Sequence, residues 1–548
     1  MKIYRSNHFI LFALLLLASC KPKLFENDGR TVFKYNESAG ITSLDPAFAR
    51  NQANIWAVNQ LFNGLVQLDD NLKVKPCIAK SWEISPDGLS YTFHLRNDVF
   101  FHQSEVFAEK KSRKVVAKDF VYSFNRILDE KLASPGAWVL AQVKKEKLKS
   151  FEALNDSTLI INLEAPFPPF LGLLCMQYCS VVPYEAIDKY GVDFRQHPVG
   201  TGPFTFGMWK EGVKLVMLKN KQYFESVDGS PLPYLDAVAV SFIVDKQSAF
   251  LEFIKGNLDF ISGIDASYKD ELLTNEGMLR SKYSSSINLT KQPYLNTEYL
   301  GILIDTNYKA AAESPLRHKL IRQAINYGFD RVKMMRYLRN NIGIAGTAGF
   351  IPAGMPWVDQ MQIKGYNFDP LKSAQLLTKA GFTNGKGLPP ITLTTNASYL
   401  DLCKFIQSQL GEIGFDVRID VTPPATLREM IAQSKVNFFR GSWIADYPDA
   451  ENYLSLFYSP NFSPSGPNYT HFSSALFDQL YNECIRESND SIRGQKYMQM
   501  DRILIEEAPV VVLYYDEVLR FSRKNISGLS SNPLNLLNLK QVKKQNDN

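Results

Sequence analysis

The sequence predicts an α/β protein with mixed sheets, and three patterns lead to this fold class. Residues 391–443 alternate strand, helix, strand, helix and strand. Residues before about 290 hold short strands, and residues 509–521 hold strongly apolar ones. Because βαβ crossovers are right-handed and place successive strands parallel, the first pattern predicts a mostly parallel sheet. The late strands need a sheet to join, and the early strands would supply it.

The early elements are short. Residues 89–95 alternate apolar and polar side chains, which is the period of a half-buried strand. Residues 158–163 and 238–244 also predict strands, and residues 117–128 and 248–255 predict helices.

The second half is richer in helices. Asp369 and Pro370 open a helix that ends before Gly381, as expected of a glycine just beyond a helix end. Other predicted helices are 315–327, 331–338, 399–413, 426–433 and 491–507, and the predicted strands between them are 391–395, 417–421 and 436–443.

Length and composition bound the function classes. The chain has 548 residues, 45% of them hydrophobic and 21% charged, which is ordinary for a globular protein and excludes a disordered or fibrous chain. At about 150 residues per domain, this length predicts three or four domains. The net charge of only +5 argues against a nucleic-acid partner.

The N-terminus predicts export and lipidation. Residues 1–19 combine two basic residues with a short apolar run, as in a signal peptide. Small residues before Cys20 resemble the lipobox of bacterial lipoproteins, in which acyl chains on the new N-terminal cysteine hold the protein to a membrane. An ordinary signal peptide with an incidental cysteine is the alternative. We therefore expect a membrane-anchored protein of the cell envelope that faces the periplasm.

Five further cysteines lie in the exported part: Cys77, Cys175, Cys179, Cys403 and Cys484. An odd number leaves at least one free thiol. The apolar surroundings of Cys175 and Cys179 favour two buried thiols over a metal pair or a disulfide.

The segment after the predicted strand 436–443 is the candidate binding site. It holds three carboxylates, Asp446, Asp449 and Glu451, together with Tyr447. Open α/β sheets bind ligands beyond the carboxyl ends of their strands, so a cationic ligand group is expected near Asp446. A solvated acidic loop is the alternative.

The search for catalytic motifs is negative. The sequence has no HExxH, GxSxG, SxxK or phosphate-loop pattern, and its six histidines are scattered. We expect no enzyme, no metal and no cofactor. The basic runs 110–118 and 144–149 suit a solvated surface better than a dock for an acidic partner.

Short motifs along nearly the whole exported chain resemble the extracytoplasmic solute-binding proteins of family 5, the peptide-binding components of ABC importers. They keep the family's order, although each alone is weak. They are Ser43-Leu44-Asp45-Pro46, Leu61–Leu65, the stretch 76–101 with Ser81-Trp82-Glu83, Gly200-Thr201-Gly202-Pro203-Phe204, Arg322-Gln323-Ala324, Asp369-Pro370 and Trp443 with Asp446-Tyr447-Pro448. A basic insertion at 103–116 departs from the family pattern.

The resemblance implies a two-lobed periplasmic-binding-protein fold of type II, the "Venus flytrap", with an extra inserted domain and mixed sheets. Lobe 1 would combine residues 20–54, 191–290 and 508–548, with residues 55–190 inserted as the extra domain. Lobe 2 would be residues 291–507.

The resemblance also implies a role for each site residue. Asp446 would hold the α-ammonium of a peptide, and Trp443 and Tyr447 would be walls of the cleft. The closed protein, a monomer, would deliver its peptide to a membrane permease with ATPase subunits. The alternatives are another solute (a metal chelate, haem, a sugar or a murein peptide), a periplasmic peptidase, or a chaperone-like lipoprotein.

Overall fold

The computed structural model describes residues 29–108 and 111–545. The predicted signal peptide 1–19, the predicted anchor at Cys20 and part of the basic insertion lie outside these ranges. Within them, no helix has the length and apolar character that crossing a membrane requires.

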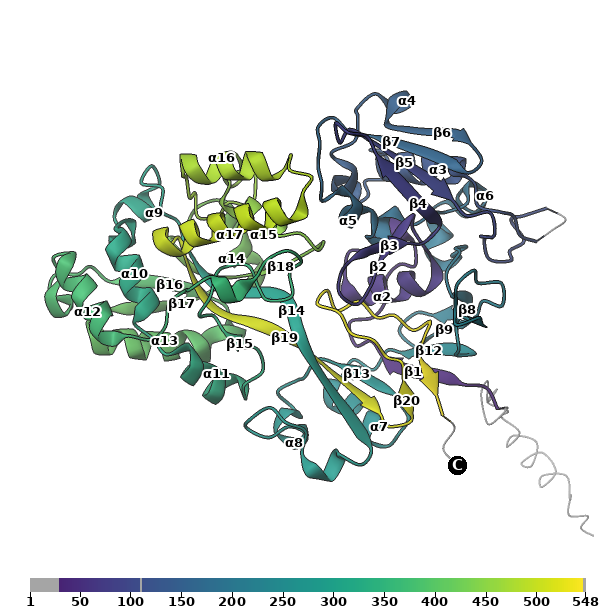
Figure 1. The fold of residues 1–548 in the computed structure, drawn as a ribbon. Helices are drawn as coiled ribbons and strands as arrows, with labels where there is room; N and C mark the ends of the chain where they lie inside the picture. The colour runs from purple at the N-terminus through teal and green to yellow at the C-terminus, as the bar shows by residue number, and fades with distance from the viewer. Residues whose placement is uncertain (1–28, 109–110, 546–548) are drawn as a thin grey trace, which may run out of the picture.

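Two lobes share one mixed sheet of 11 strands (Figure 1). Ten of its strands follow one another in space as β17 (Val417–Val421), β16 (Ile391–Thr395), β18 (Phe438–Ile444), β14 (Ile287–Ile302), β19 (Val510–Arg523), β13 (Phe260–Ser262), β1 (Val32–Asn36), β12 (Ala237–Ser241), β9 (Lys214–Lys219) and β8 (Phe204–Lys210), while β15 (Ile344–Ala345) pairs with β19.

Smaller sheets complete the first lobe. A four-stranded sheet stands apart at the top right of Figure 1, in the order β4 (Ala79–Ile84), β5 (Ser90–Leu95), β7 (Thr158–Asn162) and β6 (Phe151–Asn155). The two-stranded pairs are β2 (Val66–Leu68) with β3 (Val74–Pro76), β10 (Ser226–Val227) with β11 (Ser230–Pro231), and β20 (Ile526–Ser527) with β21 (Lys543–Lys544).

The α-helices divide between the two halves of the chain. Those before β14 are α2 (Gln52–Leu61), α3 (Ala117–Ile127), α4 (Lys147–Ser150), α5 (Phe170–Leu174), α6 (Tyr184–Tyr190), α7 (Lys246–Ile254) and α8 (Lys269–Leu272). Those after it are α9 (Lys309–Ala312), α10 (Lys319–Tyr327), α11 (Arg331–Arg339), α12 (Pro370–Lys379), α13 (Leu400–Ile413), α14 (Pro424–Ala432), α15 (Glu451–Leu454), α16 (Ala475–Cys484) and α17 (Asp490–Glu507).

The predicted alternation of strands and helices in the second half is confirmed. Strand β16 runs parallel to both β17 and β18, and α13 and α14 make the crossovers. Helix α13 ends at Gly414, whose φ of 107° is the left-handed conformation that glycine adopts most easily. The sheet turns antiparallel at β14, so the whole is mixed rather than mostly parallel.

The late apolar segments form one strand rather than two. Strand β19 continues through Asp516 and Glu517 and pairs with β14 along almost its whole length. It joins the early strands only through β13, whereas its first half lies in the other lobe. The predicted lobe boundaries near residues 290 and 507 stay predictions, and both long strands near them run through the two halves of the sheet (Figure 1).

The apolar character of these strands follows from burial on both faces. Val510 and Val512 belong to the core beneath α15–α17, whereas Val511 and Leu513 belong to the core beneath α10–α13. A strand covered by helices on both faces reads as a continuous apolar run, which explains why periodicity is absent from residues 509–515.

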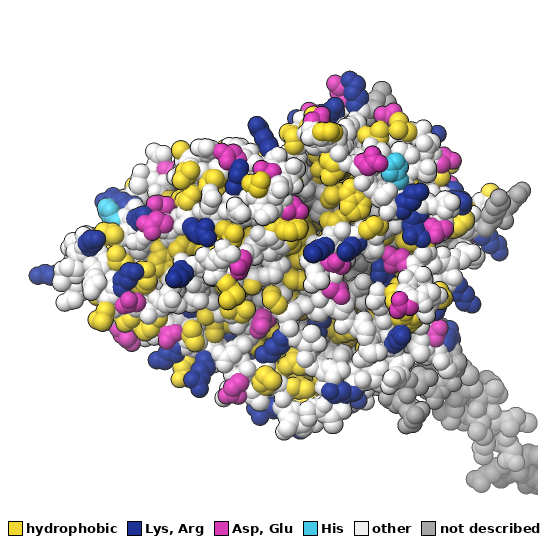
Figure 2. Space-filling model, viewed as in Figure 1, with side chains coloured by type: hydrophobic (Ala, Val, Ile, Leu, Met, Phe, Trp, Pro, Cys, Tyr) yellow, Lys and Arg dark blue, Asp and Glu magenta, His cyan; other side chains and the backbone are white. Residues whose placement is uncertain are grey.

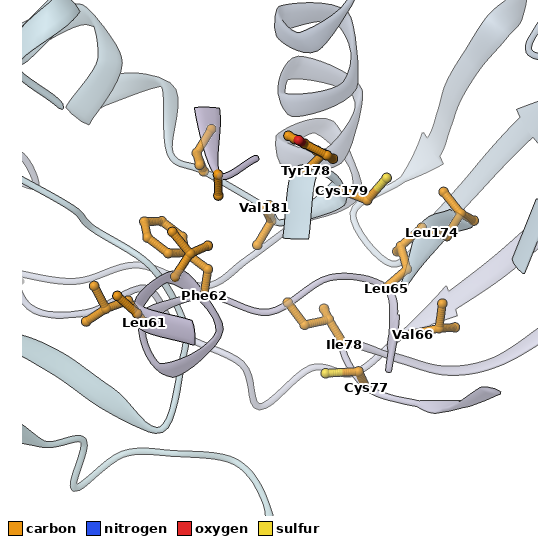
Figure 3. Packing of buried hydrophobic residues seen from close by; sticks show 14 of the residues in the cluster. Leu61, Phe62, Leu65, Val66, Cys77, Ile78, Leu174, Tyr178, Cys179 and Val181 are labelled. Carbon is orange, nitrogen blue, oxygen red and sulfur yellow. The ribbon is translucent and has the colours of Figure 1, made fainter. Parts of the chain in front are cut away.

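The five cysteines of the described part of the chain are all free. Cys77 and Cys179 lie among aliphatic side chains of the first lobe's core, as Figure 3 shows. Burial raises the pKa of the Cys77 thiol to about 12 and also raises that of Cys179, so both remain protonated. They act as small hydrophobes, whereas Cys175 is only half-buried.

Part of the basic insertion is held in place by contacts of Arg113. The Arg113 guanidinium bonds the carboxylates of Asp119 at 2.8 Å and of Glu185 at 2.6 Å, and it stacks 4.9 Å from the centre of the Phe101 ring. This arginine therefore anchors the insertion to α3 and α6.

A buried carboxylate links α17 to the loop that holds Phe350 and Ile351. Asp501 has no exposed surface, and it accepts hydrogen bonds from the backbone N–H groups of Phe350 at 2.7 Å and Ile351 at 3.2 Å. Burial raises its pKa from 3.8 to about 7, although both hydrogen bonds oppose the shift.

This pKa predicts a pH dependence of stability. Because the folded pKa lies above the unfolded one, the contribution of Asp501 is present below about pH 4 and is lost as the pH rises toward 7. Between pH 5 and 7 the free energy of unfolding should fall by about 2 kcal/mol more in the wild type than in Asp501→Asn. Urea unfolding at several pH values measures this difference, and equal slopes for the two proteins would contradict it.

Candidate functional site

A cavity of about 370 Å³ lies between the two lobes. Figure 2 shows the surface hollowed between the lobes, with hydrophobic side chains on both sides. The first lobe contributes Arg50, Gln52, Ile55, Trp56, Asn59, Leu68, Trp138, Gly172, Cys175, Met176, Gln177, Tyr178, Leu534, Asn535 and Leu536, and the sheet side contributes Tyr294, Ile444, Ala445, Asp446 and Pro448. Concave, largely apolar walls with few polar groups are typical of a small-molecule site.

Asp446 lines this cavity just beyond the end of β18. Its side chain is open to the cavity, and it forms no ion pair within the described part of the chain. The surrounding protein raises its pKa, because desolvation disfavours the charged form, while a hydrogen bond with Asn452 acts in the opposite direction. A carboxylate held in this way suits a cationic ligand group.

The charge of Asp446 raises the pKa of two tyrosines, Tyr294 and Tyr178. Burial raises the pKa of Tyr294 to about 12, and the carboxylates of Asp516 and Asp446 add to the effect. Burial and then Asp446 raise the pKa of Tyr178, which Arg50 lowers. Both tyrosines line the same cavity as the Asp446 carboxylate.

Tyr447 is buried between the lobes. Its hydroxyl donates to the Glu451 carboxylate, and its ring centre lies 6.3 Å from that of Trp138 in the first lobe. It belongs to the first lobe's hydrophobic core, although its sequence position is in the second half. Its contacts therefore join the lobes beside the cavity.

Trp443 lies on β18, opposite Thr297 of β14. Its indole N–H donates to Asn452 Oδ1 at 2.8 Å, and the half-buried ring packs against the core beneath α15–α17. It is absent from the set of described residues that line this cavity. Through Asn452 it supports the loop that carries Asp446.

The other two carboxylates of the segment are buried and paired. Asp449 accepts from the Tyr497 hydroxyl at 2.6 Å and lies 3.5 Å from the Arg493 guanidinium. Glu451 accepts from the hydroxyl groups of Tyr447 and Tyr481. Only Asp446, of the three, faces the cavity.

A buried group elsewhere in the second lobe has the atoms of a serine–histidine–aspartate triad. His471 Nε2 lies 3.0 Å from Ser463 Oγ, and His471 Nδ1 lies 3.2 Å from Asp305 Oδ2. Ser434 Oγ lies 3.2 Å from the same Nε2 atom. Both serines and the histidine are buried, so neither hydroxyl faces solvent. The hydrogen bonds of this group hold loops of the second lobe together.

No group of three His, Cys, Asp and Glu side chains within residues 29–108 and 111–545 is arranged to hold a metal ion.

Residues 73–465 match the bacterial extracellular solute-binding proteins, family 5. The chain belongs to this family. The match includes the segment with Asp446 and most of the elements that line the cavity. The resemblance found in the sequence is therefore confirmed.

Two relatives resemble this chain along most of their length. Heme-binding protein A of Haemophilus influenzae is 29% identical over 528 residues and covers 91% of each chain. The glutathione-binding protein GsiB of Escherichia coli is 23% identical over 500 residues, which are 89% of this chain and 90% of that protein. These proteins are solute-binding proteins.

Solved structures share the fold. The ABC transporter-associated periplasmic binding protein DppA of Helicobacter pylori, in complex with the peptide STSA, is 27% identical with a TM-score of 0.72, over 94% of this chain and 98% of that one. HbpA2 of Haemophilus parasuis has a TM-score of 0.79 at 22% identity, over 94% of this chain and 100% of that one. The two-lobed type II fold is confirmed.

Several cavity residues carry no signal in the sequence. Arg50, Trp138, Tyr178 and Tyr294 come from distant parts of the chain, and no periodicity or motif joins them. Of these four, only Arg50 adjoins a motif that resembles the family, since it follows Asp45-Pro46 by four residues.

Substitutions of two neighbouring aspartates should differ sharply in their effect on stability. Asp449→Ala should lower the free energy of unfolding by about 3 kcal/mol, because it leaves a buried guanidinium and a buried hydroxyl short of a partner. Asp446→Ala should change it by less than about 0.5 kcal/mol, because Asp446 has no ion pair to lose. Urea unfolding of both variants measures this contrast, and a larger loss for Asp446→Ala would contradict it.

Proposed function

We propose that this chain captures peptides with a free N-terminus in the cleft between its lobes, with the Asp446 carboxylate binding the peptide's α-ammonium group. The observation that carries this proposal is an unpaired carboxylate in an interlobe cavity of a solute-binding protein. DppA of H. pylori, which was solved with a peptide, supports it.

The chemistry of the cavity suits a peptide. An ammonium group taken out of water is costly unless a fixed anion and hydrogen bonds replace its hydration, and Asp446 supplies the anion. Trp56, Trp138 and Tyr178 offer aromatic surface for side chains. Ordered water would fill the space left by smaller side chains.

The remaining steps of transport extend this proposal. Closure of the lobes would bend β14 and β19, the strands that join them, and would enclose the peptide. A membrane permease with ATPase subunits would then receive it. Acyl chains on Cys20 would keep the protein, as a monomer, at the periplasmic face of a membrane.

A second candidate ligand follows from the characterised relatives. Heme-binding protein A and GsiB are named for haem and glutathione. Glutathione carries a free α-ammonium group and would use Asp446 as a peptide does. Haem carries none, so its binding would not depend on the charge of Asp446.

Peptide binding should require both the ligand's amine and the charge of Asp446. Free peptides at 100 times their dissociation constant should stabilise the purified chain by about 2.7 kcal/mol in a thermal-shift screen of peptides of two to six residues. The matching N-acetylated peptides should give no shift. Asp446→Asn should cost about 2–5 kcal/mol of affinity for free peptides, as for one partner of a desolvated charge pair.

Acidification should also weaken the binding of free peptides. Because the pKa of Asp446 is raised, its carboxylate is neutralised at a higher pH than an ordinary aspartate, and affinity should fall as the pH drops through that value. Asp416→Asn, on an exposed carboxylate near β17, is the matched control and should bind as the wild type does. Equal binding of free and acetylated peptides would refute the proposal. A shift with haem alone would transfer the function to the second candidate.

A further inference from the structure

The cavity between the lobes has one positive and one negative side chain. Among the described residues that line it, Arg50 and Asp446 alone carry full charges. Arg50 comes from the first lobe and Asp446 from the loop after β18. Tyr178 lines the same cavity, and its pKa is raised by Asp446 and lowered by Arg50.

Arg50 is firmly placed, yet its charged group is free. Its backbone N–H donates to the Phe48 carbonyl at 2.9 Å, and the next residue, Asn51, caps α2 through a 3.0 Å bond to the N–H of Asn54. The Gln177 side chain donates to the Ala49 carbonyl at 2.6 Å. The side chain of Arg50 is exposed and makes no ion pair or hydrogen bond within residues 29–108 and 111–545.

The surroundings of Arg50 favour an anion. The first turns of α2, a helix of 10 residues, contribute Gln52, Ile55 and Trp56 to the same wall. The positive end of a helix dipole adds to the field of the guanidinium. An arginine also matches a carboxylate geometrically, since it can donate two parallel N–H bonds.

We propose that Arg50 binds the α-carboxylate of the ligand while Asp446 binds its α-ammonium, so that the preferred ligands are short zwitterionic peptides whose two termini both fit within the cavity. This inference rests on the proposed function, because it takes the peptide amine to lie at Asp446. A peptide with both ends held would connect the two lobes through its own charges. Longer peptides would carry their carboxylate beyond Arg50.

A competing position for the guanidinium is the neighbouring groove. Arg50 also borders a surface groove of about 780 Å³ in the first lobe, which Arg126, Lys131 and Arg195 line as well. If Arg50 served that groove, its loss would leave the recognition of peptide termini unchanged.

The test is a matrix of ligands and variants measured by isothermal titration calorimetry on the purified full chain. The probes are the dipeptide Met-Leu and the tetrapeptide Ser-Thr-Ser-Ala, each free, N-acetylated and C-amidated. For the wild type, amidation of Met-Leu should weaken binding at least about tenfold. Amidation of the longer peptide should weaken it less.

The variants separate this inference from the proposed function. Arg50→Gln should weaken binding of free Met-Leu about tenfold and leave binding of amidated Met-Leu unchanged, which abolishes the discrimination. Arg50→Lys should keep part of the preference for free over amidated Met-Leu. Arg336→Gln, on an exposed arginine of α11, is the matched control and should behave as the wild type does.

Each outcome decides one or both of the two proposals. Rejection of acetylated peptides together with equal binding of free and amidated Met-Leu would overturn the role of Arg50 and leave that of Asp446. If Arg50→Gln still preferred free over amidated Met-Leu as strongly as the wild type does, that result would also overturn the role of Arg50 and leave that of Asp446. Failure of every free peptide to bind would overturn both. The melting temperature of each variant without ligand shows that it is folded, and Arg50→Lys repeats the test if Arg50→Gln is not.

Discussion

The antiparallel pairing of β14 with β19 holds the two lobes in one molecule. Its register runs from Ile287 opposite Arg523 to Gly301 opposite Val510, so one ladder of backbone hydrogen bonds spans both halves of the sheet. The ladder is interrupted between Pro293 and Thr297, where the register shifts. Proline lacks a backbone donor, and a shifted register bends a strand. The lobes are therefore tied along strands that have a built-in weak point between them.

Charged side chains gather next to this weak point. Glu298 and Arg440 form a buried pair, and the Arg440 guanidinium lies 3.3 Å from the centre of the Tyr399 ring. Nearby, Arg339 bonds Asp516 at 2.8 Å. Buried charges cost free energy unless they are paired, so this network limits the arrangements open to the strands at the junction. The network fixes the geometry of the junction more than it adds to the free energy of unfolding.

In the cleft, charged residues with partners in the protein have structural roles, whereas those without an ion pair line the cavity. Asp449 and Glu451 are deep in the second lobe and have partners within the protein, so they hold the loop in place. Asp446 and Arg50 lie at the cavity and form no ion pair with described residues, so their charges are available to a ligand. Residues of one chemical type, within six positions of one another, thus have different roles because of their surroundings.

The sequence by itself determined the class of fold, the family and most of the second lobe. The strands 391–395 and 417–421 lie where the pattern predicted them, because period, helix caps and terminal glycines are local properties. It also placed Asp446 at a cavity, since position beyond a strand end is a topological property.

Only the tertiary structure decided which carboxylate is free, that Trp443 supports the loop through Asn452, and that Tyr447 is buried against Trp138. It also brought Arg50 and Asp446 to the wall of one cavity, although nearly 400 residues separate them. Such contacts depend on how two lobes meet, and no local preference of the chain encodes that.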